Sequence, residues 1–371
     1  MAGPARAAGG ETGALLRRLV QVEPPEVPAL LWSFAYFFSL LCGYYVVRPM
    51  RDAMGIAGGV EQLHWLFTGT FVAMLAAVPL FGFVTSRFPR RRFLPWVYWF
   101  FIANLLGFHA LLRAEGGQVA AARAFFIWTS VFNLFVVSVF WSFMADLFTS
   151  AQAKRLFGFI AAGGTLGALA GPALAAALAR PLGPSSLLLL SAGFMGVAVL
   201  CIHRLVAWKD RQADQATEEA RAGEARPLGG GILAAVPLVL RSPYLLGIAL
   251  FMLLYTTTST VLYFQQAQIV RESVQGDAER TALFAAVDLA VNALTIGIQV
   301  LLTGRLLRAL GVAVTLALVP ALLGPGFLAL ALAPVLGVVV LVQVLRRAGD
   351  YALTRPAREL LYVVLGREEK Y

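Results

Sequence analysis

Asp288 is an ionisable side chain inside an otherwise apolar segment, residues 282–303. Asn292, Thr295 and Gln299 follow at intervals of four, three and four residues, so all four side chains share one face of a helix. An ionised group at the centre of a bilayer-spanning helix costs about 2.5–3.5 kcal/mol of insertion free energy. Because of this cost, Asp288 is a candidate functional residue. The stripe is suited to line a polar cavity in which Asp288 binds a solute or carries a proton. An interhelical hydrogen-bond ladder is the alternative interpretation.

Hydroxyl and amide side chains also gather in a second apolar segment, residues 243–264 and just beyond. Tyr255 and Ser259 share a helix face with Gln266, and four threonines surround Ser259 in the sequence. The pattern predicts a binding surface at Tyr255 and Ser259. Because hydroxyls can also return hydrogen bonds to the carbonyl four residues earlier and bend a helix, a hinge is an equal alternative.

Two arginines follow the first apolar segment, residues 28–48. Tyr44, Arg48, Arg51 and Asp52 are spaced four, three and one residue apart, which places two cations and a ring on one side of a helix. Guanidinium groups bind carboxylate or phosphate oxygens in pairs, and a ring can stack on a base. The alternative is an end anchor, with Arg48 reaching the interface and pairing with Asp52, because 28–47 already supplies about 20 residues for a span.

The elements that position these residues are apolar segments long enough to cross a bilayer. The composition is 59% hydrophobic and 13% charged, with a mean hydropathy of +0.76. Because the apolar runs are continuous rather than alternating, they indicate helices and not barrel strands. We therefore expect an all-α polytopic membrane protein with ten spans: 28–48, 63–85, 93–112, 122–147, 157–179, 185–206, 243–264, 282–303, 312–333 and 334–352.

The net charge of +10 is distributed as a topology signal. With the N-terminus in the cytoplasm, 23 of the 30 basic residues fall on that side, and this count includes Arg346 and Arg347 near the end of the last segment. We expect a multi-pass protein of a bacterial inner membrane with a cytoplasmic N-terminus. Its partners are then the lipid bilayer and a small solute, and no nucleic acid.

A polar stretch near the middle divides the chain. We expect an N-terminal tail at 1–27 with a short surface helix, a six-helix half at 28–208, a cytoplasmic linker at 209–242 and a four-helix half at 243–371. A motif beginning at Asp146 recurs 204 residues later at Asp350, as parallel transporter repeats predict. The second half is two helices shorter than the first, and we expect two final helices to be missing.

Small residues mark the segment 157–179, where Gly163, Gly167 and Gly171 recur every four residues and Pro172 follows. They favour the close approach of a neighbouring helix. This pattern resembles the fifth-helix motif of antiporters in the major facilitator superfamily. The basic turn from Gly82 to Arg91 likewise resembles that superfamily's Gly-x3-Asp-Arg-x-Gly-Arg-Arg signature, with Ser86 in place of the aspartate and Pro89 in place of the second glycine. Plain helix packing is the alternative interpretation of the three glycines.

A further resemblance concerns three short motifs. They are Tyr45-Val-Val-Arg48-Pro-Met-Arg51-Asp52, then Ala151-Gln-Ala-Lys154-Arg155-Leu-Phe157, and finally Arg358-Glu-Leu-Leu-Tyr362. Together they resemble the ATP/ADP translocases of bacteria and plastids, which have a facilitator-like fold. The resemblance implies a transporter of twelve helices that works by alternating access and exchanges ATP for ADP or another nucleotide. It also implies that Arg48, Arg51 and Lys154 bind the anionic substrate.

Enzymatic functions are disfavoured. The sequence has no Gly-x4-Gly-Lys-Ser/Thr phosphate loop, and its cysteines, Cys42 and Cys201, lie inside predicted spans. We expect no cofactor and no metal site. The primary hypothesis is a secondary transporter that exchanges nucleotides. The alternatives are an ion-coupled facilitator in which Asp288 carries a proton, and a membrane module that transports nothing.

Overall fold

The computed structural model describes residues 22–87, 90–114, 116–213 and 242–361, and these residues form helices and no strand. Contacts between residues divide the chain into two compact units. Unit 1 comprises Met1–Ala216 with Gly276–Ala286, and unit 2 comprises Thr217–Gln275 with Val287–Tyr371. Each unit is described by itself.

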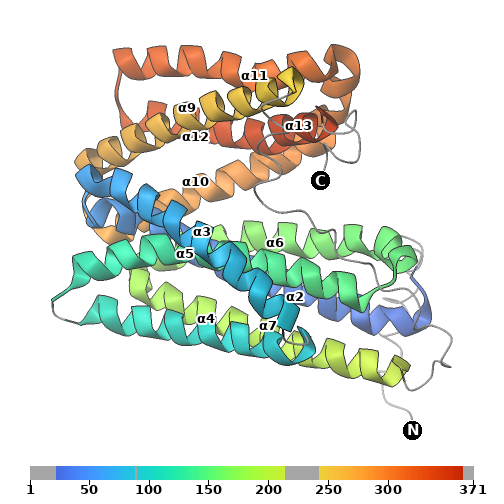
Figure 1. Ribbon diagram of the computed structural model, residues 1–371. Coiled ribbons are helices and arrows are strands. Elements are labelled where there is room, and N and C mark those ends of the chain that lie inside the picture. The colour runs from blue at the N-terminus through green and yellow to red at the C-terminus, as the bar shows by residue number, and fades with distance from the viewer. Residues whose placement is uncertain (1–21, 88–89, 115, 214–241, 362–371) are drawn as a thin grey trace, which may run out of the picture. The chain divides into compact units, whose positions relative to one another are not determined.

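Unit 1 is a bundle built around its first long helix (Figure 1). Helices α5, α6 and α7 pack against α2, while α4 packs on α5 and α7 and α3 packs on α5. The short 3-10 turns η1 (Pro24–Glu26) and η2 (Val60–Gln62) precede α2 and α3. The helices are α2 (Val27–Ala57), α3 (Leu63–Arg87), α4 (Arg90–Arg113), α5 (Gln118–Leu147), α6 (Ser150–Leu182) and α7 (Pro184–Ala213).

Glycines bring α6 into backbone contact with α2. A Cβ atom added to Gly163 would lie 2.6 Å from the carbonyl oxygen of Phe34, and one added to Gly171 would lie 2.7 Å from that of Cys42. At Gly167 the added atom would collide with the carbonyl oxygen of Phe38 and lie 2.9 Å from the backbone nitrogen of Cys42. These positions accept no side chain, because backbone atoms cannot move aside as a flexible side chain can.

Aromatic side chains fill the centre of unit 1. Phe37 stacks on Phe140 with ring centroids 4.1 Å apart, and Trp128 stacks on Phe132 at 4.9 Å. The fully buried Tyr36 donates a hydrogen bond from its hydroxyl to that of Tyr98, at 2.6 Å. The aromatic packing therefore fixes α2 against α4 and α5.

Unit 2 contains the remaining helices. They are α9 (Pro243–Ser273), α10 (Asp277–Ile298), α11 (Gly304–Leu332), α12 (Leu336–Gly349) and α13 (Arg355–Leu361). Two π-helical turns join them, η4 (Gln299–Thr303) between α10 and α11, and η5 (Asp350–Thr354) between α12 and α13. The first residues of α10 count with unit 1. The apolar core of unit 2 comprises Leu262, Ile269, Leu323, Leu330 and Val339.

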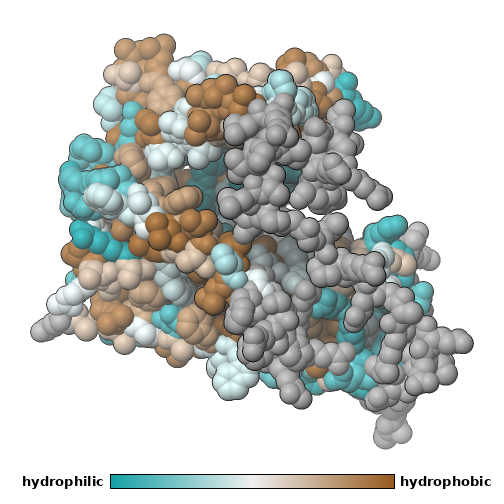
Figure 2. All heavy atoms as spheres, viewed as in Figure 1, coloured by the Kyte–Doolittle hydropathy of each residue, from teal (hydrophilic) through white to brown (hydrophobic). Residues whose placement is uncertain are grey.

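Large apolar side chains are exposed on the outside of the helices. Trp96 is 76% exposed and Leu332 is 79% exposed, and Figure 2 shows hydrophobic residues spread over the visible face. Eight helical stretches in the described residues are long and apolar enough to cross a membrane. The prediction of an all-α polytopic membrane protein is confirmed.

Several predicted boundaries were wrong. The first span continues to Ala57, and α7 continues to Ala213, so the expected linker at 209–242 begins inside a helix. The spans predicted at 282–303 and 312–333 belong to one apolar stretch, Asp277–Leu332, which is interrupted at Gly311, where φ is +75°. The expected surface helix before residue 22 and the part of the linker at 214–241 lie outside the described residues.

Candidate functional site

The main candidate site is a group of polar side chains inside unit 2, here called the α12 cluster. It joins three helices through side-chain hydrogen bonds and an ion pair. Its bonded members are Ser259 and Gln266 on α9, Asp288 on α10, and Gln343, Arg346 and Arg347 on α12. The hydroxyl of Tyr255 on α9 lies beside Arg346 and has no hydrogen-bond partner among the described residues.

A buried ion pair joins α10 to α12. The Nη2 atom of Arg347 donates a hydrogen bond to Oδ1 of Asp288 at 2.6 Å, and the side chains are 13% and 1% exposed. A charge-assisted contact of this length fixes the positions of both groups. Asp288 is therefore placed inside the bundle, as its position in an apolar segment predicted, but with an arginine beside it that the prediction did not include.

Arg346 is held by neutral partners. Its Nη1 atom donates to the hydroxyl of Ser259 at 2.9 Å, and Nε and Nη2 donate to Oε1 of Gln343 at 3.3 and 2.9 Å. Tyr255 and Asp350 lie nearby. Within the described part of the chain, no carboxylate oxygen comes within 4.0 Å of this guanidinium group. The α12 cluster thus contains an arginine whose charge has no ion-pair partner there.

The polar stripe on α10 is only partly directed inward. Asn292 and Thr295 are buried, and the hydroxyl of Thr295 has no hydrogen-bond partner among the described residues. Gln299 is instead exposed and donates to the carbonyl oxygen of Tyr351 in η5, at 3.2 Å. Gln299 therefore joins one π-helical turn to another, and the cavity-lining role expected for it stays a prediction.

The hydroxyls of α9 have two kinds of hydrogen-bond partner, and the binding-surface and hinge interpretations both stay predictions. Thr257 and Thr258 return hydrogen bonds to the carbonyls of Leu253 and Leu254, each at 2.8 Å. Ser259 instead accepts its bond from Arg346 across the helix interface. Helix α9 continues without interruption from Pro243 to Ser273, so the threonine hydroxyls do not break it.

The arginines of the first helix lie within α2 and not at its end. Arg51 stacks over the ring of Phe126 at 3.9 Å, donates to the carbonyl oxygen of the same residue at 3.3 Å and pairs with Asp52 at 3.1 Å. Arg48 lies over the ring of Tyr45 at 5.8 Å. These residues lie six to nine positions before Ala57, where α2 ends, and the substrate-binding and end-anchor interpretations both stay predictions. Tyr44 stands beside the ring of Phe132, at 6.3 Å.

Lys154 is exposed and lies far from those arginines. Gly171 packs on Tyr45, and Lys154 precedes Gly171 by 17 residues on the same helix. At 1.5 Å per residue, this places Lys154 about 25 Å away along α6. The three residues that the family resemblance implied as substrate ligands are therefore not brought together in unit 1.

Arg155, next to Lys154 on α6, forms an ion pair with Glu26 at the start of α2. It donates to both carboxylate oxygens of Glu26, at 2.9 and 3.3 Å, and the Glu26 side chain is only 3% exposed. Gln152 donates to the same carboxylate at 2.9 Å, and the indole of Trp208 donates to the carbonyl oxygen of Pro25 at 3.0 Å. This group, here called the Glu26 clasp, ties the start of α2 to α6 and α7.

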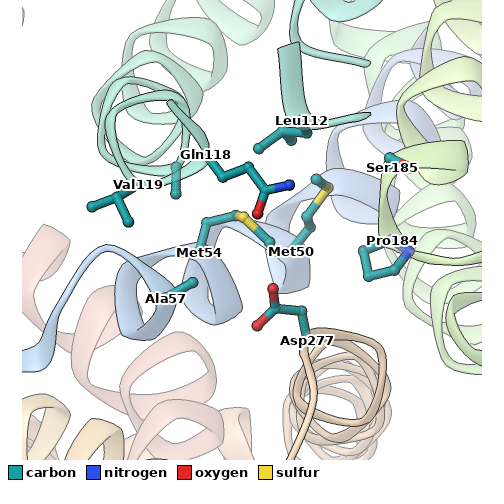
Figure 3. A pocket seen from close by; sticks show the side chains of 10 residues that line it. Met50, Met54, Ala57, Leu112, Gln118, Val119, Pro184, Ser185 and Asp277 are labelled. Atoms are coloured by element: carbon teal, nitrogen blue, oxygen red, sulfur yellow. The ribbon is translucent and has the colours of Figure 1, made fainter. Parts of the chain in front are cut away.

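A cavity of about 220 Å³ lies in unit 1, where α2 and α4 end and α5 and α7 begin (Figure 3). Met50 and Met54 point into it, with Gln118, Ser185 and Asp277 at its edge. Asp277 also pairs with Arg280 at 3.5 Å. The wall therefore combines apolar side chains with polar ones, and its carboxylate already has a cation beside it.

Sequence reasoning missed three members of the α12 cluster. The distribution of basic residues assigns Arg346 and Arg347 to a cytoplasmic flank, and the sequence predictions do not include Gln343. Their spacing carried a signal, because Gln343, Arg346, Arg347 and Asp350 recur at intervals of a helical turn within the predicted span 334–352. An apolar helix that keeps such a face toward its neighbours has the pattern of a polar interior site.

Long apolar helices around a buried charged cluster define a polytopic membrane protein with polar groups inside its bundle. The comparisons place it more closely: the model of the Major Facilitator Superfamily matches residues 30–350, and the chain belongs to that family. A solved structure of similar fold is a bacterial homolog of the human lysosomal transporter Spinster, in an inward-facing and unoccupied conformation. The two chains are 13% identical, with a TM-score of 0.50 over 94% of this chain and 78% of the other. No curated protein matches the sequence.

Proposed function

We propose that the protein is a secondary transporter of a small anionic solute, and that the α12 cluster binds the solute's negative charge. Membership of the facilitator family supports alternating access as the mechanism. The observation that carries the proposal is Arg346, a guanidinium group inside unit 2 that is oriented by an amide and a hydroxyl and has no carboxylate within ion-pair distance in the described residues.

The charges of the α12 cluster favour an anion. It contains two guanidinium groups, on Arg346 and Arg347, and the carboxylate of Asp288, while the nearby carboxylate of Asp350 pairs with Arg355 at 3.2 Å. A buried charge is costly unless it is paired, so a site with one cation in excess gains most by binding a carboxylate or phosphate. Arg51 supplies a further cation in unit 1, although Asp52 and Phe126 already engage it.

Transport of an anion is tested in proteoliposomes. Arg346→Gln removes the charge while keeping hydrogen-bonding groups, and we expect it to reduce uptake of the transported anion at least tenfold. The matched control is Arg308→Gln, because Arg308 is an arginine of the same unit whose guanidinium is exposed and bonded to a carbonyl of its own helix. Equal uptake by the two variants would contradict a role for Arg346.

Nucleotide exchange is the specific form that the motifs near Arg48 and Lys154 support. Vesicles loaded with ADP are then expected to take up labelled ATP, and empty vesicles are not. Absence of counterflow with every nucleotide tested, together with uptake of another anion, would reject nucleotides and retain the transporter. Arg48 is the better-supported of the two, since Lys154 is exposed and lies about 25 Å along α6 from Gly171, the glycine that packs beside Tyr45.

Ion-coupled transport is a second candidate, favoured by the burial of Asp288 beside Arg347. A carboxylate in such a pair can alternate between binding the arginine and binding a proton, which would link solute movement to a proton gradient. Asp288→Asn should then abolish accumulation driven by a gradient and leave solute exchange intact. Normal accumulation by this variant would exclude Asp288 as the proton carrier.

A further inference from the structure

One edge of the Arg346 guanidinium is occupied by a neighbouring side chain. The Nε and Nη2 groups, which form one of the two guanidinium edges that can bind an oxyanion in pairs, both donate to the single oxygen Oε1 of Gln343, at 3.3 and 2.9 Å. The other available group, Nη1, is held by Ser259 at 2.9 Å. An anion that approaches Arg346 therefore meets Gln343 on the Nε/Nη2 edge and Ser259 at Nη1.

We propose that Gln343 is a placeholder for the substrate, in that its amide oxygen occupies the position of an oxyanion oxygen and is displaced when the substrate binds. This inference rests on the proposed function and adds the residue that sets the affinity of the site. A carboxylate or phosphate supplies two oxygens and a negative charge, so each N–H of the edge gains its own charge-assisted bond. The neutral amide supplies one oxygen for both groups and is the weaker ligand.

Displacement of Gln343 requires a change of rotamer in a buried side chain, which is 1% exposed. Gln343 precedes Arg346 by three residues on α12, so their contact is local to one helix face. Its Nε2 atom also donates to Oε1 of the buried Gln266, at 2.6 Å. That second bond gives the displaced amide a partner on α9, while Ser259 keeps the guanidinium in place.

The geometry also selects a class of ligand. An anion with two oxygens on one atom, such as a carboxylate or a phosphate, can bond both N–H groups of the edge at once. A halide presents one atom, as Gln343 already does, and gains less from displacing it. We therefore expect the α12 cluster to prefer oxyanions to chloride at equal concentration.

The test measures binding to the full chain in detergent by isothermal titration calorimetry, with ADP and with inorganic phosphate as probes at constant ionic strength. Gln343→Leu removes the competing oxygen, and we expect binding to become about two- to tenfold tighter, the range that corresponds to one ordinary hydrogen bond. Gln343→Glu places a carboxylate on Arg346 and should weaken binding at least as much as Arg346→Gln, by about tenfold or more. Gln268→Leu is the control, because Gln268 is an exposed glutamine that bonds Glu272 on α9.

Removing Gln343 alone leaves the buried amide of Gln266 without its donor, so Gln343→Leu combined with Gln266→Leu is measured as well, with thermal unfolding to verify folding. Tighter binding by a folded variant lacking Gln343 supports the placeholder. Unchanged or weaker binding by both folded variants overturns it, as does the absence of binding of either probe to any variant. A third outcome separates the two proposals: the wild type binds, Arg346→Gln abolishes binding and the Gln343 variants have no effect. That outcome supports the anion site at Arg346 and contradicts the displacement of Gln343. If Arg346→Gln binds normally, the proposed site itself is wrong.

Discussion

Replacing Gly167 by alanine tests the contact between α2 and α6 with the smallest possible change. The added methyl group meets the carbonyl oxygen of Phe38 and lies 2.9 Å from the backbone nitrogen of Cys42, both parts of the α2 backbone. Neither atom can rotate away, so the two helices must separate along their interface. Gly158, on the same helix, has no atom of another residue within 4 Å of such a methyl group, and Gly158→Ala is the matched control.

Two effects of a glycine-to-alanine substitution change the free energy of unfolding in opposite directions. Overpacking a well-packed contact costs about 1–3 kcal/mol, and the Gly167 site lies near the upper end because it meets backbone. Alanine in place of glycine inside a helix gains up to about 1 kcal/mol from propensity, whatever the position. We therefore expect Gly167→Ala to destabilise by about 2 kcal/mol and Gly158→Ala to stabilise by up to about 1 kcal/mol.

The assay is thermal unfolding of each purified variant in the same detergent, followed by circular dichroism. The expected order of Tm is Gly158→Ala at or above the wild type, and Gly167→Ala well below it. Because the substitution and the helix are the same, differences in propensity cancel between the variants. A Tm for Gly167→Ala equal to that of Gly158→Ala would refute the close approach of α2 and α6.

Two further predictions concern buried ion pairs. Asp288→Ala leaves the guanidinium of Arg347 without its carboxylate and should destabilise the protein by about 3–5 kcal/mol. Replacing both residues by leucine together should cost much less. A double-mutant cycle on thermal unfolding measures the difference, and additive effects would contradict the pairing. Arg155→Gln should lower the Tm because the buried carboxylate of Glu26 loses its cation, while Lys154→Gln, at the exposed neighbouring position, should leave the Tm unchanged. Equal losses from the two α6 variants would argue against the Glu26 clasp.

The sequence predicted the helices well, because about 20 apolar residues in succession have few other stable structures. Hydropathy alone could not predict the residues at which the helices end. Helix α2 runs to Ala57 because Arg51 finds Asp52 and the carbonyl oxygen of Phe126 inside unit 1, and a hydropathy count treats both charges as reasons to stop. Hydropathy did place a gap between the spans 282–303 and 312–333, and the structure interrupts the helix within that gap, at Gly311, after the π-helical turn η4 has continued α10 into α11.

The sequence could predict which residues of the candidate site share a helix face, but not which residues of other helices they contact. Periodicity along one helix placed Tyr255 and Ser259 on a common face and Asp288 inside the bundle. It could not supply the partners, since Asp288 pairs with Arg347 59 residues later and Ser259 pairs with Arg346 87 residues later. Counting arginines for topology also assigned Arg346 and Arg347 to a flank, because that rule considers a residue's charge and not its helix face.

The Glu26 clasp has a consequence for how the chain is made. The first helix leaves the ribosome carrying a carboxylate whose partners, Gln152 and Arg155, are 126 and 129 residues further along. At a synthesis rate of about 5–20 residues per second, α2 must wait about 6–26 s before α6 arrives to complete it. During that interval the face of α2 that packs against the glycines of α6, and the carboxylate of Glu26, lack their partners on α6. The nascent first helix must therefore be held by the insertion machinery until α6, the fifth long helix of unit 1, has entered the membrane.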